Sequence, residues 1–119
     1  MISVGSFSKR EHLLKSKEFS AVYKRGRSFK KNGFVLCVMA NGLAQSRLGF
    51  SISSASVKLA SIRNRIRRLF REIYKKHRAA FKSTVDMVLI VRKSPGKKFL
   101  YKEAEASFFA LAKEAGILA

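Results

Sequence analysis

The side chains best suited to a chemical task lie in one short stretch, which reads Arg63-Asn64-Arg65-Ile66-Arg67-Arg68-Leu69-Phe70-Arg71. From Arg63 to Arg78 the chain has eight lysines and arginines but one acidic residue, Glu72. Arginine presents a planar fork of N–H donors that binds phosphate oxygens in pairs and stacks on nucleobases. Asn64 could cap a local backbone turn or hydrogen-bond a ribose or base edge. These residue types indicate contact with a nucleic acid.

The charge of the whole chain points the same way. Lysine and arginine total 26 against 7 acidic residues, which gives a formal net charge of +19. No acidic residue occurs between Glu18 and Glu72, while twelve lysines and arginines do. A surface charged only for solubility would mix the two signs. A polyanionic partner would neutralise this excess and release counterions, so we expect one.

Candidate catalytic and metal-binding groups are few and scattered. His12 and His77 are distant in the sequence and flanked by basic residues, so phosphate contact or solvation explains them better than general-base chemistry. One cysteine and two histidines cannot form a structural zinc site. Cys37 lies in an apolar run that is typical of a buried, inert thiol. We therefore expect no catalytic residue and no metal site on this chain.

Aromatic residues near the first cationic cluster have two interpretations. Phe19 and Tyr23 are one helical turn apart, and Phe34 begins the next apolar run. They could belong to the core, or they could stack the bases of a single-stranded RNA whose backbone follows neighbouring cations. The sequence by itself favours the core.

A helix over residues 57–78 is predicted to position the cationic stretch. Its apolar residues recur at intervals of three and four and share one face: Ile62, Ile66, Leu69 and Ile73. Basic residues follow one another every four positions along another flank: Arg63, Arg67, Arg71 and Lys75. Glu72 could pair locally with Arg68 or Lys76. A membrane surface or calmodulin could also bind such a helix, but its apolar face is needed for a core.

The rest of the chain predicts a small α+β domain spanning residues 1–119. Residues 1–15 are expected to form an extended arm. Helices are predicted over residues 16–26, with Ser16 as cap and Gly26 as stop, and over 98–115. Strands are predicted over 33–41, 46–54 and 85–91, with a shorter one near 27–30. Asn41-Gly42 predicts a hairpin between the strands at 33–41 and 46–54. The order is α-β-β-β-α-β-α, with helices on a mainly antiparallel sheet.

The chain has no stretch near the roughly 18 apolar residues needed to span a bilayer. Its N-terminus has no long apolar segment of the kind found in signal peptides. A cytoplasmic location with no membrane contact is the simplest expectation.

The run from Arg63 to Tyr74 closely resembles the signature of the bacterial ribonuclease P protein subunit, approximately R-N-R/K-x-K/R-R-x-x-R-E. The resemblance covers essentially the whole chain, because further residues occur in the expected order and spacing: Phe7, Leu13, Phe19, Val22, Tyr23, Gly26, Phe34-Val35-Leu36 and Leu48-Gly49-Phe50.

The resemblance implies a division of labour. In that family a catalytic RNA with bound Mg²⁺ cleaves the 5′ leader from precursor tRNA, and one protein per RNA supports it. In that family the protein binds RNA and does not perform the chemistry. The whole ribonucleoprotein is an endonuclease, a hydrolase that acts in tRNA processing. The family fold also includes a left-handed β-α-β crossover around the basic helix, a handedness that is rare.

The resemblance implies two sets of site residues, each carried over by its position in the matching pattern. The residues expected to contact the catalytic RNA are Lys58, Arg63, Asn64, Arg65, Arg67, Arg68 and Arg71. Those expected to line a cleft for the single-stranded leader, between the first helix and the sheet, are Phe19, Tyr23, Arg27, Phe34 and Leu36. Two positions depart from many family members: Ser54-Ala55 replaces a Lys-Lys pair, and His12 replaces an arginine. The first change removes two cations beside the motif, and at the second a neutral histidine would weaken a phosphate contact at pH 7.

Three other classes of protein compete with this interpretation. A ribosomal protein or RNA chaperone would explain the charge but not the ordered match. A double-stranded DNA-binding protein could place the basic helix in a major groove. A protein-only nuclease would need catalytic residues, which the sequence does not supply.

Overall fold

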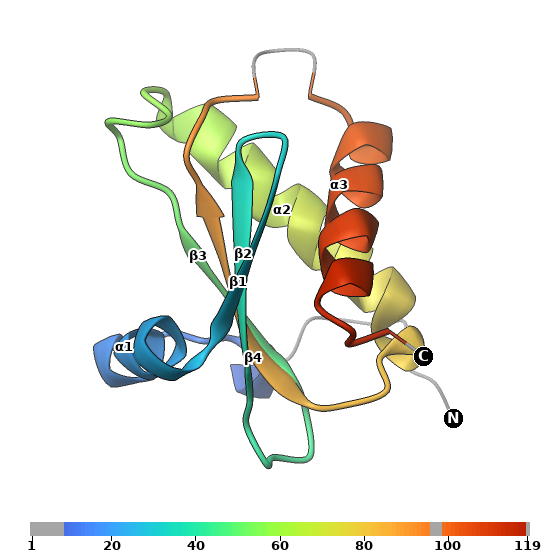
Figure 1. The fold of residues 1–119 in the computed structure, drawn as a ribbon. Helices are drawn as coiled ribbons and strands as arrows, with labels where there is room; N and C mark the ends of the chain where they lie inside the picture. The colour runs from blue at the N-terminus through green and yellow to red at the C-terminus, as the bar shows by residue number, and fades with distance from the viewer. Residues whose placement is uncertain (1–8, 96–98, 119) are drawn as a thin grey trace.

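The computed structural model describes residues 9–95 and 99–118, whose arrangement is shown in Figure 1. In chain order the elements are η1 (Lys9–Glu11), α1 (Ser16–Arg25), β1 (Arg27–Lys31), β2 (Phe34–Ala40), β3 (Arg47–Ser51), α2 (Ala60–His77), η2 (Arg78–Ala80), β4 (Val85–Val91) and α3 (Tyr101–Glu114). The helices and strands confirm the predicted α-β-β-β-α-β-α order. The 3-10 turns η1 and η2 come in addition to it.

The four strands form one mixed sheet in the order β1-β2-β4-β3. β2 pairs antiparallel with β1 and with β4, whereas β3 pairs parallel with β4. The sheet is therefore mainly antiparallel, as predicted, and α2 joins the parallel strands β3 and β4 as a crossover. The predicted hairpin between residues 33–41 and 46–54 is wrong. β4 lies between the two strands, because its run of buried side chains suits a central position.

The actual hairpin connects β1 with β2 through Asn32-Gly33. Both residues have positive φ angles, 51° and 82°, as a tight two-residue hairpin turn requires. The pairing sets Lys31 opposite Phe34 and Lys30 opposite Val35. Asn32-Gly33 carries the same local hairpin signal as Asn41-Gly42, but no hairpin was predicted there.

Asn41 instead shapes the loop that leads from β2 to β3. Its Oδ1 accepts a hydrogen bond from the backbone N–H of Leu43 at 2.9 Å. Its Nδ2 donates to the carbonyl of Gln45 at 3.0 Å and to Oδ1 of Asp86 at 2.9 Å. These bonds hold the loop as it crosses the end of β4, and β3 then pairs with the edge of β4 opposite β2.

Apolar side chains alternate along the strands and form a core on each face of the sheet. One cluster lies under α2 and α3 and includes Phe34, Leu36, Val38, Met87 and Leu89. The other lies under α1 and includes Leu13, Val22, Val35, Cys37 and Val88. Figure 1 shows α1 on the opposite side of the sheet from α2 and α3. The buried thiol predicted for Cys37 is confirmed.

Several predicted boundaries are too wide. α2 begins at Ala60, because residues 53–57 form a turn in which the N–H of Val57 donates to the carbonyl of Ser53 at 2.9 Å. β3 ends at Ser51, and α3 begins at Tyr101. Lys15, and not Ser16, is the N-cap of α1. Phe7, Gly96 and the start of the predicted helix at residue 98 lie outside the described residues.

Gly26 is the C-cap of α1, as predicted. Its φ of −81° is open to any residue, so a left-handed conformation is not the reason for glycine here. A Cβ at this position would lie 2.5 Å from the carbonyl oxygen of Val22 and 2.6 Å from that of Val38. The position is therefore restricted by the close approach of α1 and β2.

Candidate nucleic-acid interface

The inner side of α2 holds the cationic helix against the core. Ile66, Phe70, Ile73 and Tyr74 are buried. The ring of Phe70 packs against those of Phe34 and Phe108 with centroids 5.3 and 6.1 Å apart. Since these contacts fix the rotation of the helix, the residues on the opposite side must face outward. This arrangement confirms the amphipathic helix that the sequence predicts.

The outer side of α2 presents cations and one amide. Asn64 and Arg68 are exposed, whereas Arg67 and Arg71 are half-buried. Nη1 of Arg67 donates to Oδ1 of Asn64 at 3.0 Å, so Asn64 orients an arginine instead of capping a turn. We call Asn64, Arg67, Arg68 and Arg71 the cationic face. It can offer planar N–H donors to phosphate oxygens.

Two predicted contact residues are used within the protein. Nη1 of Arg63 donates to the carbonyls of Val57 and Lys58, at 2.8 and 3.0 Å, and holds the segment before α2. Nε and Nη2 of Arg65 donate to the carbonyl of Phe99, at 3.2 and 3.0 Å. Lys58 is exposed in the segment that Arg63 holds.

Glu72 pairs with Lys75 at 3.2 Å and not with either of the predicted partners. The pair lies on the same helix, three residues apart, and its carboxylate is more than half exposed at 54%. Such a pair adds little stability. Glu72 therefore neutralises the charge of Lys75, which lies beyond the cationic face, and not the charge of an arginine in that face.

A hollow of about 250 Å³ lies between the cationic face and α1. Arg67, Arg71 and His12 line it together with Phe19 and Gly49. The guanidinium of Arg71 lies over the ring of Phe50, 5.4 Å from the centroid. Burial and then the charge of Arg67 lower the pKa of Arg71, yet arginine stays protonated in proteins. The hollow therefore joins the cationic face to the aromatic residues of α1.

His12, which stands where many family members have an arginine, lines this hollow together with Arg71. Burial and then the charge of Arg71 lower the pKa of His12, and the charge of Glu11 opposes them weakly. The imidazole is thus neutral at pH 7. Ser54 and Ala55, the other departure from the family pattern, are exposed before α2.

The aromatic pair on α1 is only partly packed. Phe19 is half-buried, and Tyr23 is 47% exposed. Their ring centroids are 6.3 Å apart, with the planes tilted by 55°. Phe19 packs against the buried cluster that includes Val35, and Ile90, the partner of Val35 on β4, is half-buried. An exposed tyrosine beside an apolar sheet face is suited to stacking a base.

Three predicted cleft residues lie on the other face of the sheet. Phe34 and Leu36 are 2% and 0% exposed and belong to the core under α2 and α3. Arg27 pairs with Val38, which faces the same core, and its Nη2 donates to the carbonyl of Ala115 at 3.0 Å. The prediction failed because successive strand residues alternate in direction, so Val35 and Cys37 face α1 instead.

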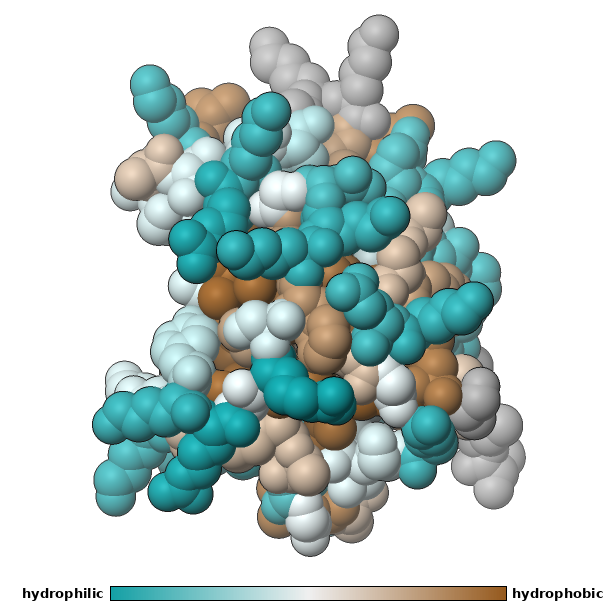
Figure 2. Space-filling model, viewed as in Figure 1, coloured by the Kyte–Doolittle hydropathy of each residue, from teal (hydrophilic) through white to brown (hydrophobic). Residues whose placement is uncertain are grey.

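Further cations, outside the predicted set of contact residues, border the α1 face. Lys30, Lys31 and Arg92 are exposed and line a hollow of about 460 Å³ together with Val35. Lys30 lies opposite Val35 and therefore on the α1 side of β1. Figure 2 shows hydrophilic side chains projecting from the visible face of the molecule, with apolar surface between them. Reading Asn32-Gly33 as a hairpin would have placed Lys30 here.

Among residues 9–95 and 99–118, no group of three or more histidine, cysteine, aspartate or glutamate side chains is placed to hold a metal ion. Over the same ranges, no helix has the length and apolar character needed to cross a membrane.

The family described as Ribonuclease P matches residues 7–116 of the chain. A ribonuclease P protein component from Clostridium botulinum strain Langeland is 37% identical over 110 residues, which cover 92% of this chain and 97% of that protein. The corresponding protein of Shouchella clausii is 37% identical over 112 residues, covering 93% and 90% of the two chains.

Solved structures of ribonuclease P proteins have the same fold. The Staphylococcus aureus protein aligns with a TM-score of 0.80 at 28% identity, over 92% of this chain and 98% of its own. The Thermotoga maritima protein aligns with a TM-score of 0.78 at 27% identity, over 88% and 97%.

Proposed function

The chain belongs to the ribonuclease P protein family, and on that basis we propose that it binds the catalytic RNA and the 5′ leader of precursor tRNA and promotes endonucleolytic removal of the leader. The observation that carries this proposal is the cationic face of α2. Four side chains able to bind phosphate or ribose stand outward, while the other side of the helix is locked into the core. One protein acts on each catalytic RNA in the cytoplasm.

Catalysis belongs to the RNA in this proposal. Five of the seven acidic residues lie in ion pairs with lysine or arginine: Glu11, Glu18, Glu72, Asp86 and Glu105. This chain is therefore poorly suited to hold the magnesium by itself, and the RNA holds most of it. The protein contributes cations that bring the two RNAs together.

The leader crosses the α1 face of the sheet. Tyr23 and Phe19 supply rings on which bases stack, and Lys30 and Arg92 supply charge for the backbone. The hollow beside Arg67 and Arg71 makes this surface continuous with the face that binds the catalytic RNA. Leader and catalytic RNA thus bind neighbouring surfaces of one small protein.

Reconstitution tests this function directly. The protein is added to a bacterial ribonuclease P RNA and a precursor tRNA at low magnesium, where the RNA alone cleaves slowly. We expect the rate of leader removal to rise with protein concentration and to saturate at one protein per RNA. Absence of stimulation would refute the proposal. Leader cleavage by the protein without RNA would favour a protein-only nuclease.

A further inference from the structure

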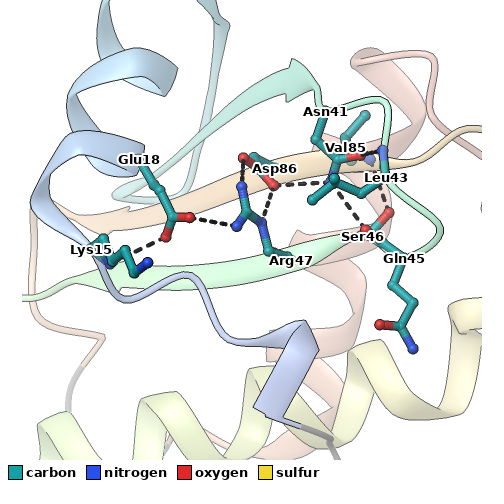
Figure 3. A network of polar contacts seen from close by, with 9 residues as sticks. All are labelled: Lys15, Glu18, Asn41, Leu43, Gln45, Ser46, Arg47, Val85 and Asp86. Carbon is teal, nitrogen blue, oxygen red and sulfur yellow. Dashed lines mark hydrogen bonds and ion pairs between the residues drawn. The ribbon is translucent and has the colours of Figure 1, made fainter.

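A network of charged side chains joins α1 to the sheet without using the cationic face of α2 (Figure 3). At its centre Arg47 on β3 lies beside Asp86 on β4, its partner in the parallel register. Asp86 is 1% exposed, so its carboxylate needs partners. Nε and Nη2 of Arg47 donate to Oδ1 and Oδ2 of Asp86, at 2.8 and 2.6 Å. The paired bonds fix the plane of the guanidinium.

The third nitrogen of the guanidinium reaches α1. Nη1 of Arg47 donates to Oε2 of Glu18 at 2.5 Å. The other carboxylate oxygen, Oε1, accepts the backbone N–H of Lys15 at 3.3 Å, where α1 begins. One guanidinium therefore connects β3, β4 and the first turn of α1, as Figure 3 shows.

α1 is otherwise held by apolar packing on the sheet. Val22 is the buried residue among its ten. Phe19, next to Glu18 in the chain, lies directly on β3, since a Cβ at Gly49 would be 2.7 Å from its Cζ. Tyr23 follows one turn later. A shift of the first turn of α1 would therefore move both rings relative to Val35 and the rest of the sheet.

We propose that Arg47 is a positioning residue for leader recognition, because through Glu18 it sets where α1 holds Phe19 and Tyr23 over the sheet. This inference rests on the proposed function, since it takes the α1 face as the leader site. Asp86 orients Arg47, and Glu18 transmits that orientation to the helix.

The variant Glu18→Gln separates positioning from simple electrostatics. It removes a negative charge from a protein that binds phosphates, so electrostatics alone predicts equal or tighter RNA binding. Loss of the ion pair with Arg47 predicts the opposite for the leader. Glu103→Gln is the matched control, because Glu103 is exposed on α3, across the sheet from α1.

The experiment measures dissociation constants of the reconstituted holoenzyme for precursor tRNA with its leader and for mature tRNA. We expect Glu18→Gln to weaken binding of the leader-bearing substrate by about 3- to 10-fold and to leave mature tRNA unchanged. Arg47→Lys should reproduce this pattern. Glu103→Gln should bind both RNAs at least as well as the parent.

Two further measurements check that α1 is the element affected. Hydrogen exchange in residues 17–25 should quicken in Glu18→Gln, while exchange in β4 stays slow. Combining Glu18→Gln with Tyr23→Ala should give a loss smaller than the product of the two single losses, because both changes act in part through the ring of Tyr23.

Parent-like or tighter leader binding by Glu18→Gln would overturn the inference, as would an equal loss on both RNAs. Failure of the proposed function would give a different experimental result from failure of this inference. In that case the parent protein itself would not stimulate cleavage or prefer the leader-bearing substrate.

Discussion

Arg65 and Phe99 are joined across α2 and the segment before α3: Nε and Nη2 of the arginine both donate to the Phe99 carbonyl, at 3.2 and 3.0 Å. An arginine in the middle of the cationic stretch thus holds the fold together. Arg63 acts similarly on the carbonyls of Val57 and Lys58. The arginines of one motif therefore divide into those that hold the chain and those that stand outward.

Alanine at Arg65 and at Arg68 should have different effects on stability. Arg65→Ala removes a charged donor from a partly buried carbonyl, so we expect the free energy of unfolding to fall by about 1–3 kcal/mol. Arg68 is exposed, and Arg68→Ala should stay within about 0.5 kcal/mol of the parent. Urea unfolding followed by circular dichroism measures both values. Equal stability of the two variants would show that the Phe99 contact is unimportant.

The double variant Arg67→Ala and Arg68→Ala should weaken binding to the catalytic RNA and make it less sensitive to salt. Each lost phosphate contact lowers the slope of log K against log [salt] by about 0.7–0.9, so two contacts give a decrease of roughly 1.5. Titrations of labelled RNA at several salt concentrations measure the slope. Lys102→Ala serves as the control, because Lys102 is an exposed residue of α3, and it should keep the parent slope. An unchanged slope in the double variant would remove these arginines from the interface.

Tyr23→Ala should reduce the preference for leader-bearing substrate. The ring is 47% exposed, so its removal should change stability little. Stacking on an aromatic ring contributes about 1–3 kcal/mol per base, which corresponds to a loss of about 5- to 150-fold on precursor tRNA. Affinities for precursor and mature tRNA, measured side by side, test this. The same loss on both RNAs would mean that Tyr23 does not contact the leader.

The order of the elements could be predicted because each has a local signal, such as the spacing of Ile62, Ile66, Leu69 and Ile73 in α2. The strand pairing could not. Asn41-Gly42 and Asn32-Gly33 carry the same hairpin signal, and only the second forms a hairpin. The choice depends on β4, which begins at Val85, far from both pairs in the sequence, and takes the place beside β2. Local sequence carries no information about that competition.

The candidate site was predictable to a similar extent. Periodicity placed Arg67 and Arg68 correctly on the outer side of α2, because the apolar residues of the helix define its inner side. It could not show that Arg63 and Arg65 reach backbone carbonyls outside the helix. The network of Arg47, Glu18 and Asp86 also escaped detection, since its members are distant in sequence and belong to no motif.

Phe34→Leu should affect stability without affecting leader recognition. Phe34 contacts the rings of Phe70 and Phe99, with centroids 5.3 and 5.4 Å away, and faces away from α1. The smaller side chain should lower the free energy of unfolding by on the order of 1–2 kcal/mol through lost contacts. The ratio of affinities for precursor and mature tRNA should stay at the parent value. A changed ratio, with stability intact, would return Phe34 to the leader site.

Tyr74 should make stability fall at high pH. Burial and then the charge of Glu11 raise its pKa from 10.0 to about 12. Below the unfolded value the phenol is neutral in both states, and the stabilisation is fully present. As pH rises from about 10 to about 12 the unfolded chain loses the proton first, so stability declines, and the contribution is gone above the folded pKa. The full difference is on the order of 2 kcal/mol.

Tyr74→Phe tests this because it removes the titrating group and keeps the ring. Urea unfolding from about pH 9 to about pH 11 should show a shallower decline in the variant than in the parent. The other side chains are the same in both proteins, so their contributions cancel in the comparison. Phenolate absorbance of the folded parent should contain a late component, near pH 12, that the variant lacks. Parallel declines in the two proteins would mean that the Tyr74 hydroxyl is more accessible to solvent than its 3% exposure indicates.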